Sequence, residues 1–246
     1  MAADIPSDVL GEIAPTGTLR AGLNMANGLL ITGTAPDGHP DGVSPDMARA
    51  LARKLGIGVE LVQFATPGEV ADAADSNVWD IGMIGAEPVR AEKIDFSAAY
   101  VEIEATYLVP EGSPLQTIED VDADGIRIAV SGRSAYDLYL SRNLKHAELI
   151  QGKGVAGATE MFLAEKMDAL AGLRPALVKD AAKIPGSRII DGKFTAVQQA
   201  IGVPRGRSAA AKFVSDFVEE SKASGLVASL IEKHGVVGRL SVGSAD

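Results

Sequence analysis

The sequence contains no cysteine, which excludes disulfide bridges, thiolate zinc sites and cysteine nucleophiles together. Aromatic residues make up only 4%, and the 23 Lys and Arg residues are outnumbered by 33 Asp and Glu, for a formal net charge of −10. Such a charge repels nucleic-acid phosphates and anionic lipid headgroups, and no basic cluster in the sequence reverses it. We therefore expect no nucleic-acid partner.

Long apolar runs are also missing. The unbroken apolar stretches span a few residues, far short of the roughly 18 that a membrane-spanning helix needs. Residues 1–6 have neither the basic start nor the apolar run of about 7–15 residues that marks a secretory signal. Either a signal was removed or none existed, so an extracytoplasmic and a cytoplasmic location both stay open.

The chain shows no arrangement typical of metal or nucleotide chemistry. Its three histidines, His39, His146 and His234, lie in a turn, at a helix exit and at the end of a C-terminal helix. They form no visible catalytic or metal-ligand pair. A glycine-rich phosphate loop followed by Lys and Ser or Thr is also missing. We expect neither a metal nor a cofactor.

The chain does contain enough apolar residues for a sizeable core, since 46% of its 246 residues are hydrophobic. That length suits one large domain or two lobes of ordinary size. In the first hundred residues, period-2 and helical patterns alternate in a β-α-β-α-β series, which predicts a largely parallel sheet. The predicted strands are 18–23, 29–32, 59–64 and 80–85. One helix is predicted to start at Ser44, with Ser44 as its N-cap, and a second helix is predicted at 67–74.

A second series of the same kind follows. Its predicted strands are 126–131, 148–150, 167–173 and 187–190, and its predicted helices are 134–144, 155–166 and 175–184. An extended segment, 194–203, then leads to two C-terminal helices with apolar faces, which have no strands of their own to cover. These two helices must therefore pack on the earlier lobe.

Several segments, taken in order, resemble the bacterial extracytoplasmic solute-binding proteins of the polar amino-acid uptake type, family 3. Together they span roughly residues 16–235. The strongest is 87–97 (EPVRAEKIDFS), and the others are 17–22 (GTLRAG), 42–56, 79–82 (WDIG), 132–134 (GRS), 167–170 (MDAL) and 225–235. Each segment is short, but their order and spacing together are fairly specific.

The resemblance implies an α/β fold of the type II periplasmic-binding-protein kind. It has two lobes, each a mostly parallel sheet flanked by helices, with two crossing strands as the hinge. The first lobe would be discontinuous, 1–104 and 201–246, and the second would be 105–200. The implied function is that of a monomeric receptor. It would trap a small carboxylate-bearing ligand, an amino acid or a related organic acid, between closing lobes and deliver it to the membrane permease of an ABC transporter, in the periplasm or another extracytoplasmic location.

Arg90 is the first candidate for ligand contact. It lies three residues after Glu87, on a short helix expected to begin at Pro88, and its planar guanidinium can hold a carboxylate through two parallel hydrogen bonds. In the family, the arginine at this motif position binds the ligand carboxylate. The alternative is a structural arginine paired with Glu92 or Asp95. Glu87 either holds an ammonium group or only starts the helix.

Gly132, Arg133 and Ser134 form the second candidate. They lie where strand 126–131 turns into a helix, so backbone N–H groups and the positive helix end would face an anion there. The family usually has threonine or serine at both positions after the glycine. Arg133 therefore either adds a second cationic contact or points into solvent, and Ser134 is either a ligand contact or only an N-cap.

Leu173 and Arg174 mark the clearest departure from the family. Relatives that bind an α-amino acid usually place an aspartate after strand 167–170 to hold the ammonium group, whereas this chain has Leu173 followed by Arg174. Asp168, earlier in the segment, is interpreted as structural. Arg174 either favours a second carboxylate on the ligand or is a solvated residue at a helix start. We therefore expect a carboxylate that lacks the ammonium group or places it elsewhere.

Four further residues complete the candidate set. Gly85 ends a buried strand and permits a close approach at its end. Asn24 and Asn27 follow the first strand, where the family presents side chains to the ligand, although each is also typical of a turn. Side chains alternate along a strand, so only one of Gln198 and Gln199 should face the cleft. Gln198 is included among the candidates, and which of the two faces the cleft stays open.

Two other functions stay open. A few relatives on this fold have become lyases, including cyclohexadienyl dehydratases, which need a positioned proton donor inside a closed cleft. Residues 170–179 contain no acid, which disfavours that function. The other alternative is a cytosolic small-molecule sensor built from the same lobes, because the chain shows neither a signal nor a lipid-anchor cysteine.

Overall fold

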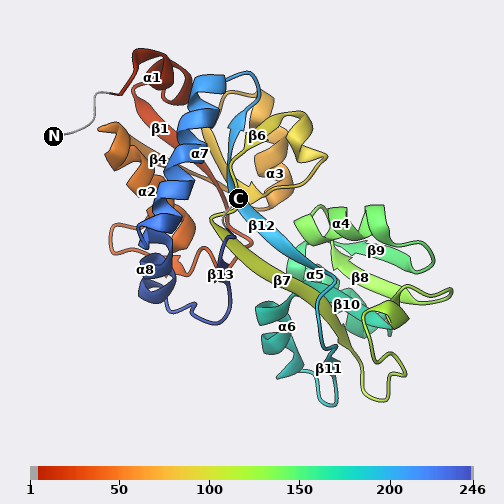
Figure 1. The fold of residues 1–246 in the computed structure, drawn as a ribbon. Helices are drawn as coiled ribbons and strands as arrows, with labels where there is room; N and C mark the ends of the chain where they lie inside the picture. Colours follow the sequence, from red (N-terminus) through yellow and green to blue (C-terminus); the bar gives the residue numbers. More distant parts are fainter. Residues whose placement is uncertain (1–4, 245–246) are drawn as a thin grey trace. The chain divides into compact units, whose positions relative to one another are not determined.

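The computed structural model describes residues 5–244, which form two compact units (Figure 1). Unit 1 comprises Met1–Glu102 and Gln198–Asp246, and unit 2 comprises Ile103–Val197. The chain passes between them in strands β7 (Val101–Val109) and β12 (Thr195–Pro204). The sequence placed these passages at 104–105 and 200–201. Residues 1–4, on which part of the signal prediction rests, lie outside the described residues.

Unit 1 is built on a mixed sheet in the order β4-β1-β5-β12. Strand β1 is parallel to both β4 and β5, while β12 is antiparallel to β5. Short strands extend this sheet, because β6 pairs with β12 and β13 pairs with β7, while β2 and β3 form a separate two-stranded sheet. The bounds are β1 Thr18–Asn24, β2 Gly33–Thr34, β3 Pro40–Asp41, β4 Gly58–Phe64, β5 Ile81–Gly85, β6 Ile94–Phe96 and β13 Ser241–Val242.

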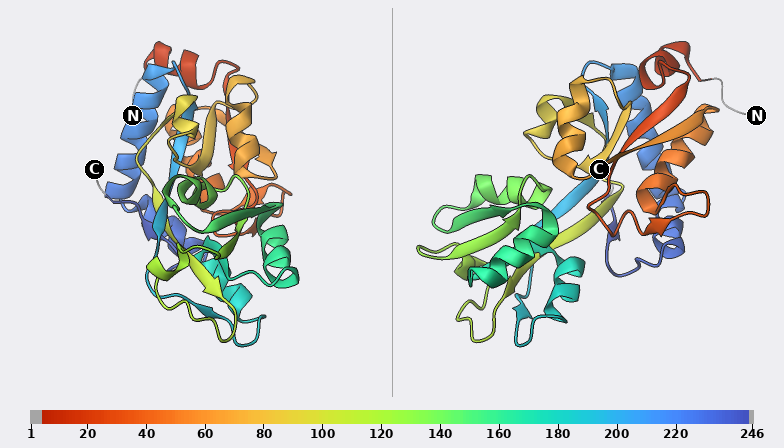
Figure 2. Two further views of the ribbon diagram at one scale, coloured as in Figure 1. Left: turned by 90° about the vertical axis from the view of Figure 1, so that its right-hand side faces the viewer. Right: turned by 180° about the vertical axis from the view of Figure 1, so that it is seen from behind.

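Helices cover both faces of this sheet (Figures 1 and 2). Helix α3 packs against β1 and β5 on one face, and α2 packs against β1, β4 and α8 on the other. Helix α7 contacts α1, α8 and β6, so the two C-terminal helices pack on the first lobe as expected. The bounds are α1 Ser7–Ile13, α2 Val43–Leu55, α3 Pro67–Asp72, α7 Ser208–Ala223 and α8 Leu226–Lys233, with short 3₁₀ helices at Ala73–Asp75 and Arg90–Glu92.

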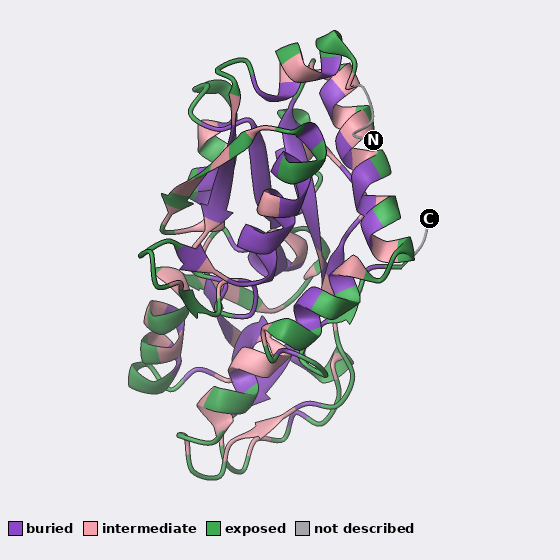
Figure 3. Cartoon of the chain, turned by 90° about the vertical axis from the view of Figure 1, so that its left-hand side faces the viewer, coloured by how far each residue is buried: buried purple, intermediate pink, exposed green. Residues whose placement is uncertain are grey.

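The indole of Trp79 fills the core between α3 and the sheet, where β5 is buried along its whole length (Figure 3). Its Nε1 donates a hydrogen bond to the Val70 carbonyl at 3.0 Å. Gly22 and Gly82 lie beside the ring, and a Cβ on Gly22 would come within 3.1 Å of it. The glycines of the two parallel strands therefore make the space that the indole occupies.

Unit 2 has the strand order β7-β10-β8-β9. Strand β8 is parallel to β9 and β10, and β7 is antiparallel to β10. Helix α4 packs on one face, with Tyr136 and Leu140 in its core, and α5 and α6 pack on the other, with Phe162 and Leu177. The bounds are β8 Arg127–Ser131, β9 Glu148–Gly152, β10 Ala169–Leu173, β11 Arg188–Ile189, α4 Ala135–Asn143, α5 Gly154–Ala164, α6 Arg174–Ala181 and a 3₁₀ helix at Glu119–Val121.

The predicted repeat of the strand and helix series is confirmed. Elements β1-α2-β4-α3-β5 and β8-α4-β9-α5-β10 have the same chain order and the same central first strand. Each copy also places an aspartate before its last strand. Asp80 accepts a hydrogen bond from the Arg20 backbone N–H at 3.0 Å, and Asp168 accepts one from the Arg127 N–H at 2.8 Å. Asp168 is therefore structural, as predicted.

Two local predictions for residues 29–44 are wrong. Residues 29–32 are not a strand, because Asn27 holds that segment in a turn: its carbonyl accepts from the Leu30 and Ile31 N–H groups at 3.0 and 2.9 Å. Ser44 is not the N-cap of α2, which begins one residue earlier, at Val43. Its hydroxyl instead hydrogen-bonds the Tyr100 hydroxyl at 2.7 Å in the core. Among residues 5–244, no helix has the length and apolar character that a membrane crossing requires.

Candidate functional site

The predicted site residues gather at the carboxyl ends of parallel strands in each unit, which is where open α/β sheets generally bind ligands. In unit 1 these ends belong to β1 and β5, and in unit 2 to β8, β9 and β10. Unit 1 holds Asn24, Asn27, Gly85, Glu87, Arg90 and Gln198, and unit 2 holds Gly132, Arg133, Ser134, Leu173 and Arg174.

Arg90 is buried, with 5% of its surface exposed, just beyond the carboxyl end of β5. The expected helix from Pro88 is instead a turn, in which the N–H of Arg90 donates to the Glu87 carbonyl at 2.9 Å, followed by the short 3₁₀ helix. The Arg90 Nη1 donates to the Gly85 carbonyl at 2.7 Å. This bond fixes the orientation of the guanidinium. Asp95, one of the two acids proposed as its partner, lies 3.5 Å from Arg205.

Asn24 and Asn27 both shape the loop after β1. The Oδ1 of Asn24 accepts from the Ala26 N–H at 3.1 Å, and the Oδ1 of Asn27 accepts from the Leu29 N–H at 3.2 Å. Both asparagines therefore have the turn role that was predicted for them as the alternative to ligand contact. Because a backbone N–H can only donate, these bonds also fix which end of each amide is oxygen.

Gly85 and the two glutamines meet where β5 pairs with β12. Gly85 lies opposite Gln199, and the Ala86 N–H donates to the Gln198 carbonyl at 2.7 Å. Gln199 is buried, at 5% exposed, and Gln198 is half-buried. The two side chains thus differ in burial as strand alternation requires. The assignment of Gln198 to the ligand stays a prediction.

The backbone donors at 132–134 are already engaged within unit 2. The N–H groups of Gly132 and Ser134 donate to the carbonyls of Gly152 and Ser131, at 3.0 and 3.2 Å. The Arg133 N–H donates to the buried Asp137 carboxylate at 2.6 Å. An anion would therefore compete with protein acceptors for these groups, which the sequence did not reveal. Ligand contact by these residues stays a prediction.

Ser134 is the N-cap of α4, because its hydroxyl oxygen accepts from the Asp137 N–H at 3.1 Å. Arg133, immediately before it, has a φ of +61°, a left-handed conformation that residues other than glycine and asparagine seldom adopt. The hydrogen bond from its N–H to Asp137 holds this conformation. The Arg133 side chain is exposed.

Arg174 starts α6 and contacts the first strand of unit 2. Its Nε donates to Glu104 Oε2 at 2.8 Å, and its Nη2 donates to the Gly192 carbonyl. Lys193 lies 3.3 Å from the other oxygen of Glu104. The hydrogen bond from Arg174, and secondarily Lys193, lowers the pKa of Glu104 against a smaller effect of burial. Leu173 is half-buried against the α4 side of the core. The sequence gives no local signal for Glu104 and Lys193, because their contacts depend on the pairing of β7 with β10.

One further cluster brings His234 next to two acids. Ligand atoms of Asp41, Asp46 and His234 lie within 4.8 Å of one another. Asp46, however, accepts from Lys233 at 2.6 Å and from Arg49 at 3.0 Å. These two protein cations neutralise the carboxylates and would repel a divalent ion, so the cluster fits a salt bridge between helices better than a metal site. The sequence did not indicate it because 188 residues separate Asp46 from His234.

Comparison with known families decides what kind of protein carries these residues. Residues 31–237 match the family of bacterial extracellular solute-binding proteins, family 3. The chain belongs to this family. The resemblance to family 3 that was predicted over residues 16–235 is therefore confirmed. The chain matches no curated protein by sequence.

Solved structures of similar fold come from several amino-acid receptors. A mutant of ArgBP from T. maritima aligns with a TM-score of 0.72 at 22% identity, covering 92% of this chain and 99% of that one. A solute receptor for L-cysteine of Neisseria gonorrhoeae aligns at 0.75 and 19% identity, covering 93% and 95%. AncCDT-1, an ancestral amino acid-binding protein and precursor of cyclohexadienyl dehydratase, aligns at 0.73 and 24%, covering 91% and 97%. These likenesses confirm the predicted α/β fold of the type II periplasmic-binding kind.

Proposed function

We propose that this family-3 protein is a receptor that captures a small carboxylate-bearing ligand, an amino acid or a related organic acid, for uptake by an ABC transporter. The observation that carries the proposal is the buried Arg90 at the carboxyl end of β5. Its orientation is set by the Gly85 carbonyl, so the guanidinium is ordered before a carboxylate arrives. Preorganisation of this kind lowers the entropy cost of binding.

The ligand is held jointly by the edges of both units, with β7 and β12 acting as the hinge of closure. Support comes from the repeat, which gives each unit the same parallel strands and hence the same kind of edge. A monomer suffices, because one chain carries both edges. The arginine and L-cysteine receptors of similar fold support an amino acid or a close analogue as the ligand class.

A binding role, rather than a lyase activity, is supported by the residues after β10. A lyase needs a proton donor at the site, and this strand ends in Leu173 and Arg174. The family is described as extracellular, which supports our proposal of a periplasmic or equivalent extracytoplasmic location with a membrane permease as partner.

Native mass spectrometry of the gently purified protein tests the proposal. We expect a retained small molecule whose mass fits an amino acid or organic acid, released on unfolding in acid and restored by adding the same compound. Incubation of the protein with prephenate or arogenate provides the matched enzymatic assay. Turnover of either compound would replace the receptor function by the lyase function.

A further inference from the structure

Strand β7 pairs with different strands in its two halves. Val101 and Glu102 pair antiparallel with β13, and both strands belong to unit 1 at this point (Figure 1). Residues 105–108 pair antiparallel with β10, within unit 2. Ile103 and Glu104 lie between the two paired stretches. The boundary between the units, after Glu102, therefore coincides with the end of the β13 pairing.

Segment 241–244 is attached to this end of β7 by more than strand pairing. The Gly243 N–H donates to the Tyr100 carbonyl at 2.9 Å, just before β7 begins. The Ser244 N–H and hydroxyl both donate to Glu102 Oε1, at 3.1 and 3.0 Å. These hydrogen bonds extend the attachment on both sides of the two residue pairs that β13 makes.

The attachment requires a glycine at position 243 and uses a point of β7 that is itself fixed. A Cβ on Gly243 would lie far inside van der Waals contact of the Ala99 carbonyl oxygen. Tyr100, the acceptor of the Gly243 N–H, is fully buried, and its hydroxyl hydrogen-bonds Ser44 of α2 at 2.7 Å. Its own N–H donates to the Gln199 carbonyl of β12 at 2.9 Å. Segment 241–244 thus joins a well-anchored part of unit 1.

Lys222 of α7 holds the segment from a third side. Its Nζ donates to the Ser244 carbonyl at 2.7 Å and lies 2.7 Å from Glu219 Oε1. Only 7% of the Lys222 side chain is exposed, which is unusual for a lysine. Segment 241–244 is therefore fastened to α7 as well as to β7, with every printed partner in unit 1.

These contacts matter because β13 is short. It has two residues, fewer than the about three to ten usual for a strand, so its place depends on the contacts on either side of it. Hinges absorb a domain motion in a few residues, and backbone that is paired and anchored resists it. A β7 that is clamped as far as Glu102 leaves Ile103 and Glu104 as the stretch in which it can bend.

We propose that segment 241–244 is a strap that clamps the unit 1 end of β7 and confines hinge bending in this strand to Ile103 and Glu104. This inference rests on the proposed closure about β7 and β12 and adds the device that limits it. With the strap in place, fewer backbone torsions are loose in the open receptor. Closing on a ligand then loses less conformational entropy.

Hydrogen exchange read residue by residue by NMR tests whether the strap clamps β7. Gly243→Ala forces the strap away from Ala99, and Lys222→Gln removes its attachment to α7, while Lys212→Gln breaks an exposed pair on the same helix and serves as the control. Successive N–H groups of a strand point to opposite edges, so at least one of residues 101 and 102 should exchange about tenfold faster or more in both strap variants. Residues 105–108 should stay within about twofold in all three.

Double electron–electron resonance on the ligand-free protein measures the consequence for the hinge. Because the chain has no cysteine, Arg53→Cys and Glu160→Cys place two nitroxide labels selectively, at exposed positions on α2 of unit 1 and α5 of unit 2. We expect the distribution of label distances to broaden by about half or more in Gly243→Ala and Lys222→Gln, because more torsions then share the motion. Lys212→Gln should leave the distribution unchanged.

The outcomes separate the strap from the receptor function. Unchanged exchange at residues 101 and 102 in both strap variants would show that the strap does not clamp β7. Faster exchange with an unchanged distance distribution, or equal broadening in Lys212→Gln, would show that the strap does not limit the hinge. Each of these results overturns the strap and leaves the carboxylate receptor intact. Since both measurements use ligand-free protein, a failure to find a carboxylate by native mass spectrometry would overturn the receptor proposal separately.

Discussion

Arg90 differs from the other arginines in residues 5–244 because it alone is buried, at 5% exposed, while the rest are half-buried or exposed. Arginine is seldom buried without a specific role. Arg90→Ala should weaken binding of the cognate ligand by about 2–5 kcal/mol, because a desolvated carboxylate would lose its charged partner. Calorimetry measures this loss. Arg53→Ala, an exposed arginine in the last turn of α2, is the matched control and should leave affinity unchanged. A folded Arg90→Ala protein with normal affinity would remove Arg90 from the site.

Leu173 leads to a prediction about whether the ligand carries an α-ammonium group. It stands where an ammonium-holding aspartate is usual, and an unpaired buried ammonium group costs several kcal/mol, on the order of 2–5. Organic acids should therefore stabilise the protein more than neutral α-amino acids in a thermal-shift screen of both sets. The prediction fails if a common amino acid gives the largest shift and Glu87→Gln abolishes it, because Glu87 would then be the replacement counter-charge.

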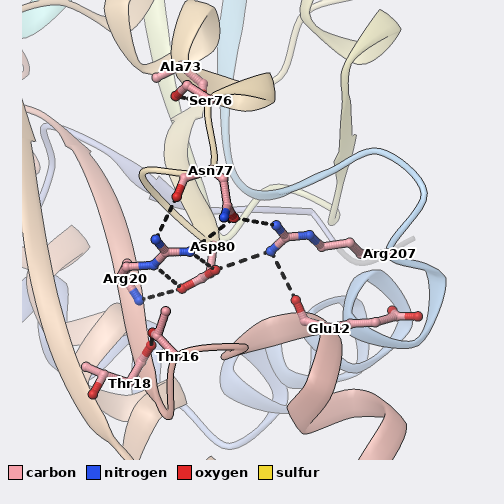
Figure 4. Close-up of polar contacts among 9 residues, drawn as sticks. All are labelled: Glu12, Thr16, Thr18, Arg20, Ala73, Ser76, Asn77, Asp80 and Arg207. Carbon is pink, nitrogen blue, oxygen red and sulfur yellow. Dashed lines mark hydrogen bonds and ion pairs between the residues drawn. The ribbon is translucent and has the colours of Figure 1, made fainter.

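Asp80, directly before β5, joins β1 to the start of α7 through Arg20 and Arg207. It is fully buried and accepts from Arg20 Nε and Nη2 at 2.9 and 2.7 Å and from Arg207 at 3.2 Å, as Figure 4 shows. Asp80→Asn should lower the free energy of unfolding by about 3–5 kcal/mol, because it leaves two half-buried guanidinium groups without the buried anion that they share. Urea unfolding followed by circular dichroism measures the change.

Asp168→Asn is the control for that experiment, since Asp168 holds the equivalent position in the repeat. It is half-buried, and its carboxylate accepts from the Arg127 backbone N–H at 2.8 Å. An asparagine oxygen can replace that acceptor, so the cost should be only about 1 kcal/mol. Equal losses in the two variants would contradict the importance given to the Arg20 and Arg207 ion pairs.

Asp46 ties α2 to the end of α8 and makes the stability of unit 1 depend on pH. Burial raises its pKa, but hydrogen bonds from Lys233, His234 and Arg49 outweigh that effect and lower it from 3.8 to about 2. A carboxyl whose pKa is lower in the folded state contributes stability above its unfolded pKa and loses it as the pH falls from about 4 to 2. After allowance for solvent screening, this contribution is about 1–2 kcal/mol.

Asp46→Asn should therefore be less stable than the unmodified protein at pH 7, with a difference that shrinks between about pH 4 and pH 2. Urea unfolding across this range measures it. Asp216→Asn removes an exposed pair with Lys212 and should change stability by less than about 0.5 kcal/mol at any of these pH values. A constant Asp46→Asn difference down to pH 2 would refute the role of its ionised form.

Most elements could be predicted from the sequence because their apolar periods are regular. The segment 29–32 could not, because its apolar residues are buried in a turn held by Asn27 rather than in a strand. Ser44 looked like a helix cap, but tertiary contact with Tyr100 decided its role. Local patterns thus located strands and helices, while long-range contacts determined what individual polar side chains do.

The same limit applies to the candidate site. The site residues were predictable as positions at strand ends, because parallel strands bring their carboxyl ends to one edge. Their partners were not: Glu104 meets Arg174 across 70 residues of sequence, through the antiparallel pairing of β7 and β10. Asp137 likewise accepts a hydrogen bond from the Arg133 N–H, which the sequence had predicted to face an anionic ligand.

For the whole molecule, the proposed receptor is one chain whose two units close on a ligand. The two passages of the chain, in β7 and β12, are the segments about which such a motion would occur. Small-angle X-ray scattering with and without the compound retained in native mass spectrometry tests this claim most directly. We expect the mass of a monomer in both samples and a smaller radius of gyration with saturating ligand. An unchanged radius of gyration under calorimetrically confirmed saturation, or an obligate dimer, would contradict the proposed closure of a monomeric receptor.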